Sequence, residues 1–115
     1  MHELSIVESM VSTADGFAKE RGIKNVAYIT VQVGALTGVI PHYLSMYYAD
    51  VTKGTALEGS ELKIEDVAAE AFCRACGEVF DPSNETHCCP ACGAEDYELL
   101  HGRELTIKDM GFTEE

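Results

Sequence analysis

The sequence predicts an α/β protein of the α+β type, with two helices on one face of a small mixed β-sheet and an inserted zinc-ribbon-like subdomain that carries four paired cysteines. Three observations lead to this fold class. Two segments have apolar residues at helical spacing, others alternate apolar and polar residues, and two C-x-x-C-G motifs stand in a segment poor in aliphatic side chains. A chain of 115 residues is long enough for one modest core.

Two segments have the periodicity of amphipathic helices. The first covers residues 4–21 and ends before Gly22, which suits a left-handed C-terminal cap. The second covers residues 41–52, with Pro41 at a favourable first position and Gly54 closing the segment. We expect the first helix to pack on the sheet through its apolar stripe of Leu4, Val7, Val11, Ala14 and Ala18.

Alternation of apolar and polar residues predicts the strands. Ile29, Val31 and Val33 alternate with polar residues in a strand of about eight residues that ends at Gly34. A second alternation starts at Leu62 and runs directly into Cys73, with a change of phase near Asp66 that we expect a β-bulge to absorb. The alternation around Leu105 and Ile107, after a turn at Gly102, predicts a last hairpin or a returning strand.

Charge and composition exclude several classes of function. The formal net charge is −12, and the eight Lys and Arg residues are scattered, whereas binding to a phosphate backbone needs a basic stripe. We therefore expect no nucleic-acid partner. No apolar run approaches the ~20 residues of a membrane span, and the first 25 residues lack the basic start and unbroken apolar stretch of a secretory signal. We expect no membrane partner and a cytoplasmic location.

The four cysteines of the paired motifs, Cys73 with Cys76 and Cys89 with Cys92, predict a closed tetrahedral site of four thiolates. The same ligands suit iron, as in rubredoxin, but the aromatic core of rubredoxin is absent, so structural Zn(II) is the favoured ion. Cys88 is left over, because its use in place of Cys89 would break the C-P-x-C turn. His87 is interpreted as a surface histidine rather than a ligand.

The predicted insert defines the domain organisation. Residues 73–97 form the inserted zinc-binding domain, and residues 1–72 with about 98–115 form the α/β domain. The chain has no G-x-S-x-G motif and no phosphate loop, and four thiolates leave zinc no open position for water. We therefore expect a protein that is not an enzyme.

The first residues of the chain offer nitrogen donors. The amine of Met1, the deprotonated amide of His2 and the His2 ring nitrogen can form fused chelate rings in one plane, which suits nickel(II) and copper(II). A histidine at position 2 is usually only part of a solvated terminus. From these residues alone, the solvated terminus is the favoured interpretation.

Motifs from residue 1 to residue 110 together resemble the HypA/HybF family of hydrogenase nickel-insertion accessory proteins. Besides the paired C-x-x-C turns, they are Met1-His2-Glu3-Leu4-Ser5, Val33-Gly34, Leu36-Thr37-Gly38-Val39, Lys53-Gly54-Thr55, Glu58-Gly59, Leu62-Lys63-Ile64-Glu65 and Gly102-Arg103-Glu104-Leu105-Thr106-Ile107. The resemblance implies a carrier of Ni(II) cargo that works with a nickel-insertion GTPase to load the [NiFe]-hydrogenase large subunit. Urease maturation proteins are further implied partners.

Carried over to this chain, the resemblance implies that nickel is held by Met1, His2 and the backbone at Glu3, and zinc by the four cysteines. Some relatives have an acidic residue near nickel where this chain has Ile40. His42, two positions on, is a possible donor, although a solvated histidine at a helix start is the commoner case. The alternative function is a zinc-ribbon scaffold for protein interactions that has no nickel role.

Overall fold

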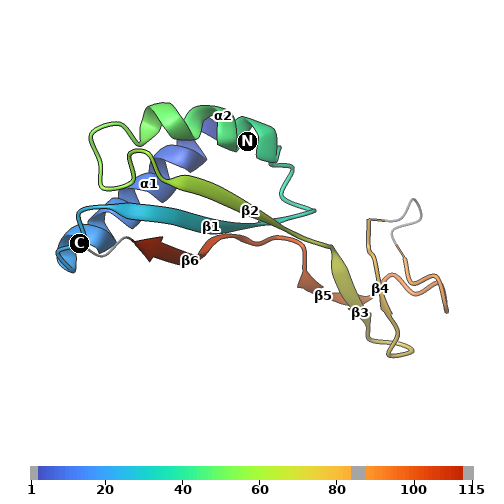
Figure 1. Cartoon of the computed structure of the whole chain (residues 1–115). Coiled ribbons are helices and arrows are strands. Elements are labelled where there is room, and N and C mark those ends of the chain that lie inside the picture. Colours follow the sequence, from blue (N-terminus) through green and yellow to red (C-terminus); the bar gives the residue numbers. More distant parts are fainter. Residues whose placement is uncertain (1–2, 84–87, 113–115) are drawn as a thin grey trace. The chain divides into compact units, whose positions relative to one another are not determined.

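The computed structural model describes residues 3–83 and 88–112. The described residues form two helices and six strands, whose arrangement along the chain can be followed in Figure 1. In order they are α1 (Glu3–Glu20), β1 (Val26–Gly34), α2 (Pro41–Val51), β2 (Glu61–Val67), β3 (Glu70–Cys73), β4 (Val79–Phe80), β5 (Tyr97–His101) and β6 (Leu105–Phe112). The predicted fold class is confirmed, with the difference that the strands form two three-stranded sheets.

Helix α1 buries the face that its sequence predicts, with one correction. Val7, Val11, Ala14 and Ala18 are buried, but Leu4 is 43% exposed. The buried stripe therefore starts at Val7, one turn later than expected. The helix ends as predicted at Gly22, which has a φ of 70°.

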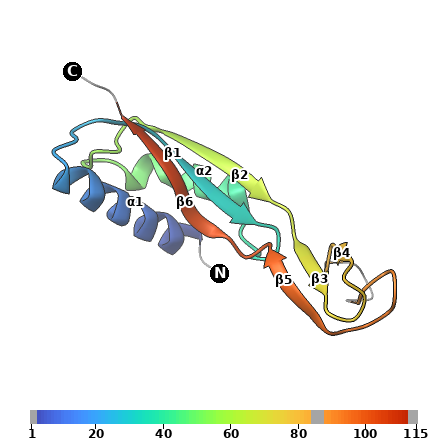
Figure 2. The same ribbon diagram turned by 90° about the horizontal axis from the view of Figure 1, so that it is seen from below.

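Strand β1 is the centre of the first sheet, whose order is β2-β1-β6. Its residues Ile29, Val31 and Val33 are buried, as the alternation predicts. Figure 2 shows β1 and β2 running in one direction and β6 in the other, so the sheet is mixed. Helix α2 connects the two parallel strands, and it packs with α1 over the same face of the sheet (Figures 1 and 2). Its residues Leu44 and Tyr48 are buried.

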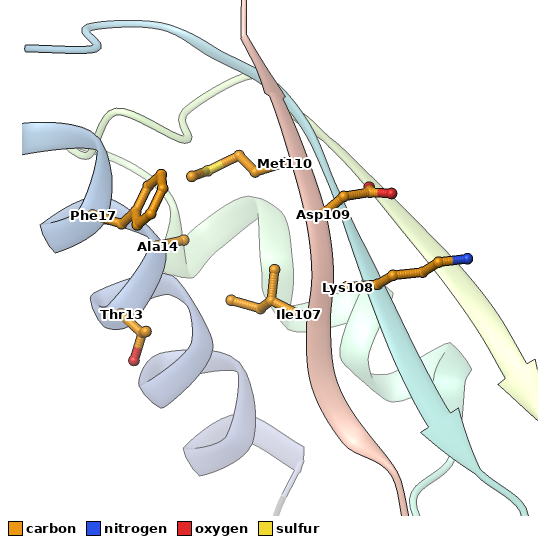
Figure 3. A pocket seen from close by; sticks show the side chains of 7 residues that line it. All are labelled: Thr13, Ala14, Phe17, Ile107, Lys108, Asp109 and Met110. Carbon is orange, nitrogen blue, oxygen red and sulfur yellow. The ribbon is translucent and has the colours of Figure 1, made fainter. Parts of the chain in front are cut away.

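The edge strand β6 presents different chemistry on its two faces. Ile107 and Met110 point toward α1, whereas Lys108 and Asp109 point away from the helices (Figure 3). Lys108 Nζ lies 2.8 Å from Glu65 Oε2 on β2, and this bond lowers the pKa of the Glu65 carboxyl. Lys108 and Asp109 are consecutive residues on one face, so they interrupt the regular alternation of the strand. Their charges on an exposed edge oppose pairing with other strands.

The predicted continuous strand from Leu62 to Cys73 is wrong. The chain breaks after Val67, and β3 begins at Glu70 in the second sheet. In the second sheet, the register is irregular between Glu70 and Ala71. A change of phase is tolerated here because each half of the segment pairs with different strands, so the two halves need not share one pleat.

The second sheet has the order β4-β3-β5 with antiparallel pairing. Its buried core is small and consists of Ala71, Cys73, Phe80 and Cys89. Tyr97 packs edge-on against Phe80, with ring centroids 5.4 Å apart. Two of the four core residues are thus cysteines of the paired motifs, so this core depends on what those sulfurs bind.

Strands β5 and β6 belong to different sheets, so the second of the two predicted alternatives, a returning strand, is the correct one. The connection passes Gly102, which has a φ of 130°. Leu36 N–H donates to Gly102 O at 2.7 Å, and Gly34 N–H donates to Glu104 O at 2.7 Å. These bonds bring the backbones at Gly34 and Gly102 into direct contact.

Backbone contacts divide the chain into two compact units. The first comprises residues 1–32, 39–65 and 106–115, and the second comprises residues 33–38 and 66–105. The second unit includes more of the chain than the predicted insert of residues 73–97. The reason is that β3, which leads into the insert, pairs with β5, which leads out of it. The division into the two predicted domains stays a prediction.

We expect Gly34→Ala to lower the free energy of unfolding by about 3 kcal/mol, the upper range for overpacking. A Cβ atom at this position would lie 2.2 Å from Gly102 O, and a backbone atom cannot rotate away. Chemical denaturation monitored by circular dichroism measures the change. Gly16→Ala is the matched control, because Gly16 lies inside α1 with nothing within 4 Å of the new Cβ. This control should gain up to about 1 kcal/mol, and equal stabilities of the two variants would contradict the close approach.

Candidate metal centre

Four cysteine sulfurs converge at one point of the second unit. Cys73 and Cys92 Sγ atoms lie 3.6 Å apart, as do those of Cys76 and Cys89, and all four lie within 4.8 Å of one another. All are free thiols. A tetrahedral ion with metal–sulfur distances near 2.3 Å needs sulfurs about 3.8 Å apart. The arrangement therefore fits one tetrahedrally coordinated ion.

The two C-x-x-C-G turns have the same backbone hydrogen bonds. In the first, Gly77 N–H donates to Cys73 O at 2.8 Å, and Cys73 N–H donates to Glu78 O at 2.8 Å. In the second, Gly93 N–H donates to Cys89 O at 2.8 Å, and Cys89 N–H donates to Ala94 O at 2.9 Å. Both glycines have a φ near 80° (80° and 78°), which is why each motif carries glycine at this position.

These turns direct backbone N–H groups at the sulfurs. The N–H of Cys76 donates to the Cys73 sulfur, the N–H of Glu78 to the Cys76 sulfur, and the N–H of Ala94 to the Cys92 sulfur. Such donors stabilise thiolate charge and so support metal ligation. The pattern arises from the two-residue spacing, as the sequence predicts.

The pKa values of Cys73 and Cys76 are shifted in opposite directions. The N–H of Cys76 is the largest of the influences that lower the pKa of Cys73 to about 7. The N–H of Glu78 is the largest single influence on Cys76 and lowers its pKa. Desolvation by burial and the neighbouring thiols, that of Cys89 first, together outweigh it and raise the pKa of Cys76 to about 12. Four adjacent thiols cannot all ionise near neutral pH without a cation. Metal binding therefore releases protons and weakens on acidification.

Within each turn the first cysteine is buried and the second is exposed, and Arg74 of the first turn contacts residues at the start of β5. Cys73 and Cys89 are buried, whereas Cys76 and Cys92 are exposed. Arg74, between the first two ligands, donates from Nη1 to Asp96 Oδ1 at 2.6 Å and to Tyr97 O at 2.9 Å. Sequence reasoning missed this clamp, because nothing in the spacing of Arg74 and Asp96 predicts their contact.

Within residues 3–83 and 88–112, these four cysteines are the group of His, Cys, Asp and Glu side chains that can hold a metal ion. Four thiolates fill a tetrahedral site and leave no position open for water or substrate. The arrangement can thus hold an ion that has no open position for a reacting molecule, as in a structural metal site.

Cys88 is half-buried and does not belong to the cluster, and His87 lies outside the described residues. We expect Cys88→Ser to leave one bound metal ion per chain, because the other four sulfurs already complete the coordination. Metal analysis of the purified variant measures the stoichiometry. Cys89→Ser is the matched comparison at the adjacent position and should lose the ion. Loss of the ion in Cys88→Ser would show that Cys88 is a ligand.

The predicted nickel ligands fall at the edge of the described chain. Met1 and His2 lie outside the described residues, and Glu3 is the first residue of α1. Glu3 Oε2 accepts a hydrogen bond from the N–H of Ile40 at 3.2 Å. His42 is exposed in the first turn of α2. The sequence carries no signal for the contact between residues 3 and 40.

No helix in the described part of the chain is both long and apolar enough to cross a membrane.

Fold and site together define a small α+β metal-binding protein with a closed centre of four thiolates. The family model described as hydrogenase/urease nickel incorporation, metallochaperone, hypA matches residues 1–112. The chain belongs to this HypA family, so the resemblance found in the sequence is confirmed. The family is one of metallochaperones rather than enzymes, as expected.

Curated relatives named Hydrogenase maturation factor HypA match nearly the whole chain. The protein from Caldanaerobacter subterraneus subsp. tengcongensis is 39% identical over 111 residues, covering 96% of this chain and 97% of that protein. The protein from Chloroflexus aggregans is 38% identical over 108 residues, covering 93% and 95%. The solution structure of the Ni metallochaperone HypA from Helicobacter pylori matches all of both chains with a TM-score of 0.69 and 20% identity. This structural similarity supports the fold.

Proposed function

We propose that the protein is a nickel metallochaperone that binds Ni(II) at its N-terminus and delivers it to the [NiFe]-hydrogenase large subunit during maturation. The single observation that carries the proposal is the match of a nickel-incorporation family over residues 1–112. The cysteine cluster supports it, because four thiolates form a centre suited to a resident ion rather than to a transferred one.

The resident ion of the proposal is structural Zn(II), held by Cys73, Cys76, Cys89 and Cys92. A closed tetrahedral thiolate site is the usual form of structural zinc. The ion would supply folding free energy to the second sheet, whose buried cluster consists of Ala71, Cys73, Phe80 and Cys89. It would take no part in nickel transfer.

The nickel site of the proposal comprises the Met1 amine, the amide and ring nitrogens of His2, and the backbone at Glu3. Planar nitrogen donors suit Ni(II), whereas four tetrahedral thiolates suit Zn(II), so the two ions are sorted by donor type and geometry. Copper(II) should compete for the nitrogen site, since it precedes nickel in affinity for such donors. Selectivity for nickel must then come from delivery and partners.

The proposed partners are those of hydrogenase maturation. They are the nickel-insertion GTPase of that process and the hydrogenase large subunit, with urease maturation proteins as further partners. The proposed location of this protein is the cytoplasm. The acidic surface, with 20 acidic residues against 8 basic ones, opposes binding to nucleic acid. It favours partners that present basic groups.

Calorimetric nickel titration of the untagged chain tests the proposal. We expect one nickel ion to bind per chain, and binding to be lost when residues are added before Met1, because an extension converts the terminal amine into an amide. The zinc content should be the same in both forms. A C-terminal extension of equal length is the control and should leave nickel binding intact. Equal nickel binding with both extensions would favour the alternative, a zinc-ribbon scaffold without a nickel role.

A further inference from the structure

The second sheet has one face that the cysteine turns cover. In antiparallel strands, residues directly opposite each other lie on the same face of the sheet. Ala71 of β3 is opposite Phe80 of β4, and both belong to the buried cluster with Cys73 and Cys89. We call the opposite face of this sheet the outer face.

The outer face carries apolar side chains that are partly exposed. Phe72 of β3 is opposite both Val79 of β4 and Glu98 of β5, so the three lie on this face. Phe72 is 38% exposed and Val79 is 50% exposed. Leu100 is 42% exposed and stands two residues after Glu98 on the same strand, beside the register irregularity. We call Phe72, Val79 and Leu100 the outer patch.

The outer patch departs from the usual chemistry of an exposed sheet face. An antiparallel sheet with one buried face normally has polar residues on the other. The first sheet has such a polar face, where Gln32 Nε2 and Lys108 Nζ donate to the two oxygens of Glu65 at 3.0 and 2.8 Å. Phe72, in contrast, contacts no other ring and no cation within the described chain. Neighbouring exposed apolar residues with a polar rim are typical of a surface that another molecule covers.

The charge around the outer patch indicates which molecule fits it. Glu70 and Glu98 lie on the outer face beside Phe72, and neither carboxylate forms an ion pair in the part of the chain that the structure describes. Residues 66–105 carry nine Asp and Glu against two Arg. This surface repels the phosphates of nucleic acids and of anionic lipids, and a second copy of the chain would bring its own carboxylates against it. It attracts Lys and Arg.

We propose that the outer patch is a docking surface for a segment of a partner protein in which apolar side chains alternate with Lys or Arg. The apolar side chains cover Phe72 and Val79, and the cations pair with Glu70 and Glu98. This role goes beyond nickel binding and does not rest on it, because the patch includes none of residues 1–3.

Titration with a synthetic peptide tests the docking surface. The probe is a short peptide in which Lys alternates with Val, added to the full, zinc-supplemented chain and followed through amide NMR shifts. We expect saturable shifts at Phe72, Val79 and Glu98, and no binding when Glu replaces Lys in the peptide. Ionic strength of about 1 M should weaken binding, because it shortens the Debye length to about 3 Å. Shifts confined to the helices, or the absence of saturable shifts, would overturn the proposal.

Matched variants locate the site. Phe72→Thr should weaken peptide binding at least about tenfold, since an aromatic residue at the centre of an interface commonly dominates its affinity. Phe112→Thr is the control, an exposed phenylalanine on a strand of the other sheet, and should have no effect. Val79→Thr keeps the shape of an exposed side chain and should also weaken binding, which repeats the test if Phe72→Thr does not fold. Glu98→Gln should weaken binding about threefold, the size of one exposed ion pair, and Glu8→Gln on α1 should not. Equal effects of Phe72→Thr and Phe112→Thr would refute the site.

A second copy of the chain is the competing occupant. If two outer patches paired, the amide shift of Phe72 would depend on protein concentration without peptide. We expect no such dependence, and its presence would overturn the proposal in favour of a dimer. The chain extended before Met1, which should lose nickel binding, should bind the peptide as well as the original chain. The docking surface and the nickel site can therefore fail separately.

Discussion

Cys76→Ser is expected to abolish binding of the proposed zinc ion and to unfold the unit formed by residues 33–38 and 66–105. The buried cluster of the second sheet comprises Ala71, Cys73, Phe80 and Cys89, two of which are ligand cysteines, so apolar packing cannot replace the ion. Structural zinc contributes roughly 10 kcal/mol or more to small metal-held modules, which exceeds the stability of most single domains. Metal analysis and the dispersion of amide signals in NMR spectra measure the two effects.

The choice of cysteine makes this result interpretable. Cys76 is exposed, so its substitution removes a ligand without emptying the core, whereas Cys73 is fully buried. Cys73→Ser should have the same outcome, which shows that ligation rather than packing is responsible. Cys88→Ser serves as the thiol control. A Cys76→Ser protein that keeps its zinc would exclude Cys76 as an essential ligand. One that stays folded without zinc would exclude a structural role for the ion. Iron with a visible thiolate band would exclude zinc.

His2→Ala is expected to weaken nickel binding by more than about 100-fold without changing zinc content or fold. Loss of a group that merely orients a ligand commonly costs 10–100-fold in metal affinity, so loss of a ligand itself should cost more. Calorimetry on the untagged chain measures the affinity. The zinc content should not change, because the thiolates of the second unit do not depend on residue 2. Equal nickel affinity in the two proteins would refute the N-terminal site.

The same site predicts how nickel binding depends on pH. The terminal amine has a reference pKa near 8 and the imidazole near 6.5, and both must lose a proton to coordinate nickel. Protons therefore compete with the ion, and the affinity should fall as the pH drops from about 8, more steeply below about 6.5. In His2→Ala the imidazole contribution is absent, so any residual binding should lack the steeper part. A profile that is flat between these values would contradict coordination by these nitrogens.

Local features of this protein follow from the sequence alone. The helical stripe of α1, the alternation in β1 and the paired C-x-x-C-G turns are determined by neighbouring residues, and the structure has each of them. The ligand set is also local in origin, because a two-residue gap followed by glycine sets the backbone bonds of each turn. Gly77 and Gly93 show this, with the same positive φ within a few degrees.

Contacts between distant segments were decided only by the tertiary structure. The break after Val67, where the sequence predicts a continuous strand, arises because the chain changes partners between two sheets. The exposure of Leu4 and the bond between Glu3 and Ile40 depend on where the starts of α1 and α2 lie. Nothing in a local pattern encodes these positions. They result from the pairing and packing of segments far apart in the sequence, where the register of one element on another selects which residues meet.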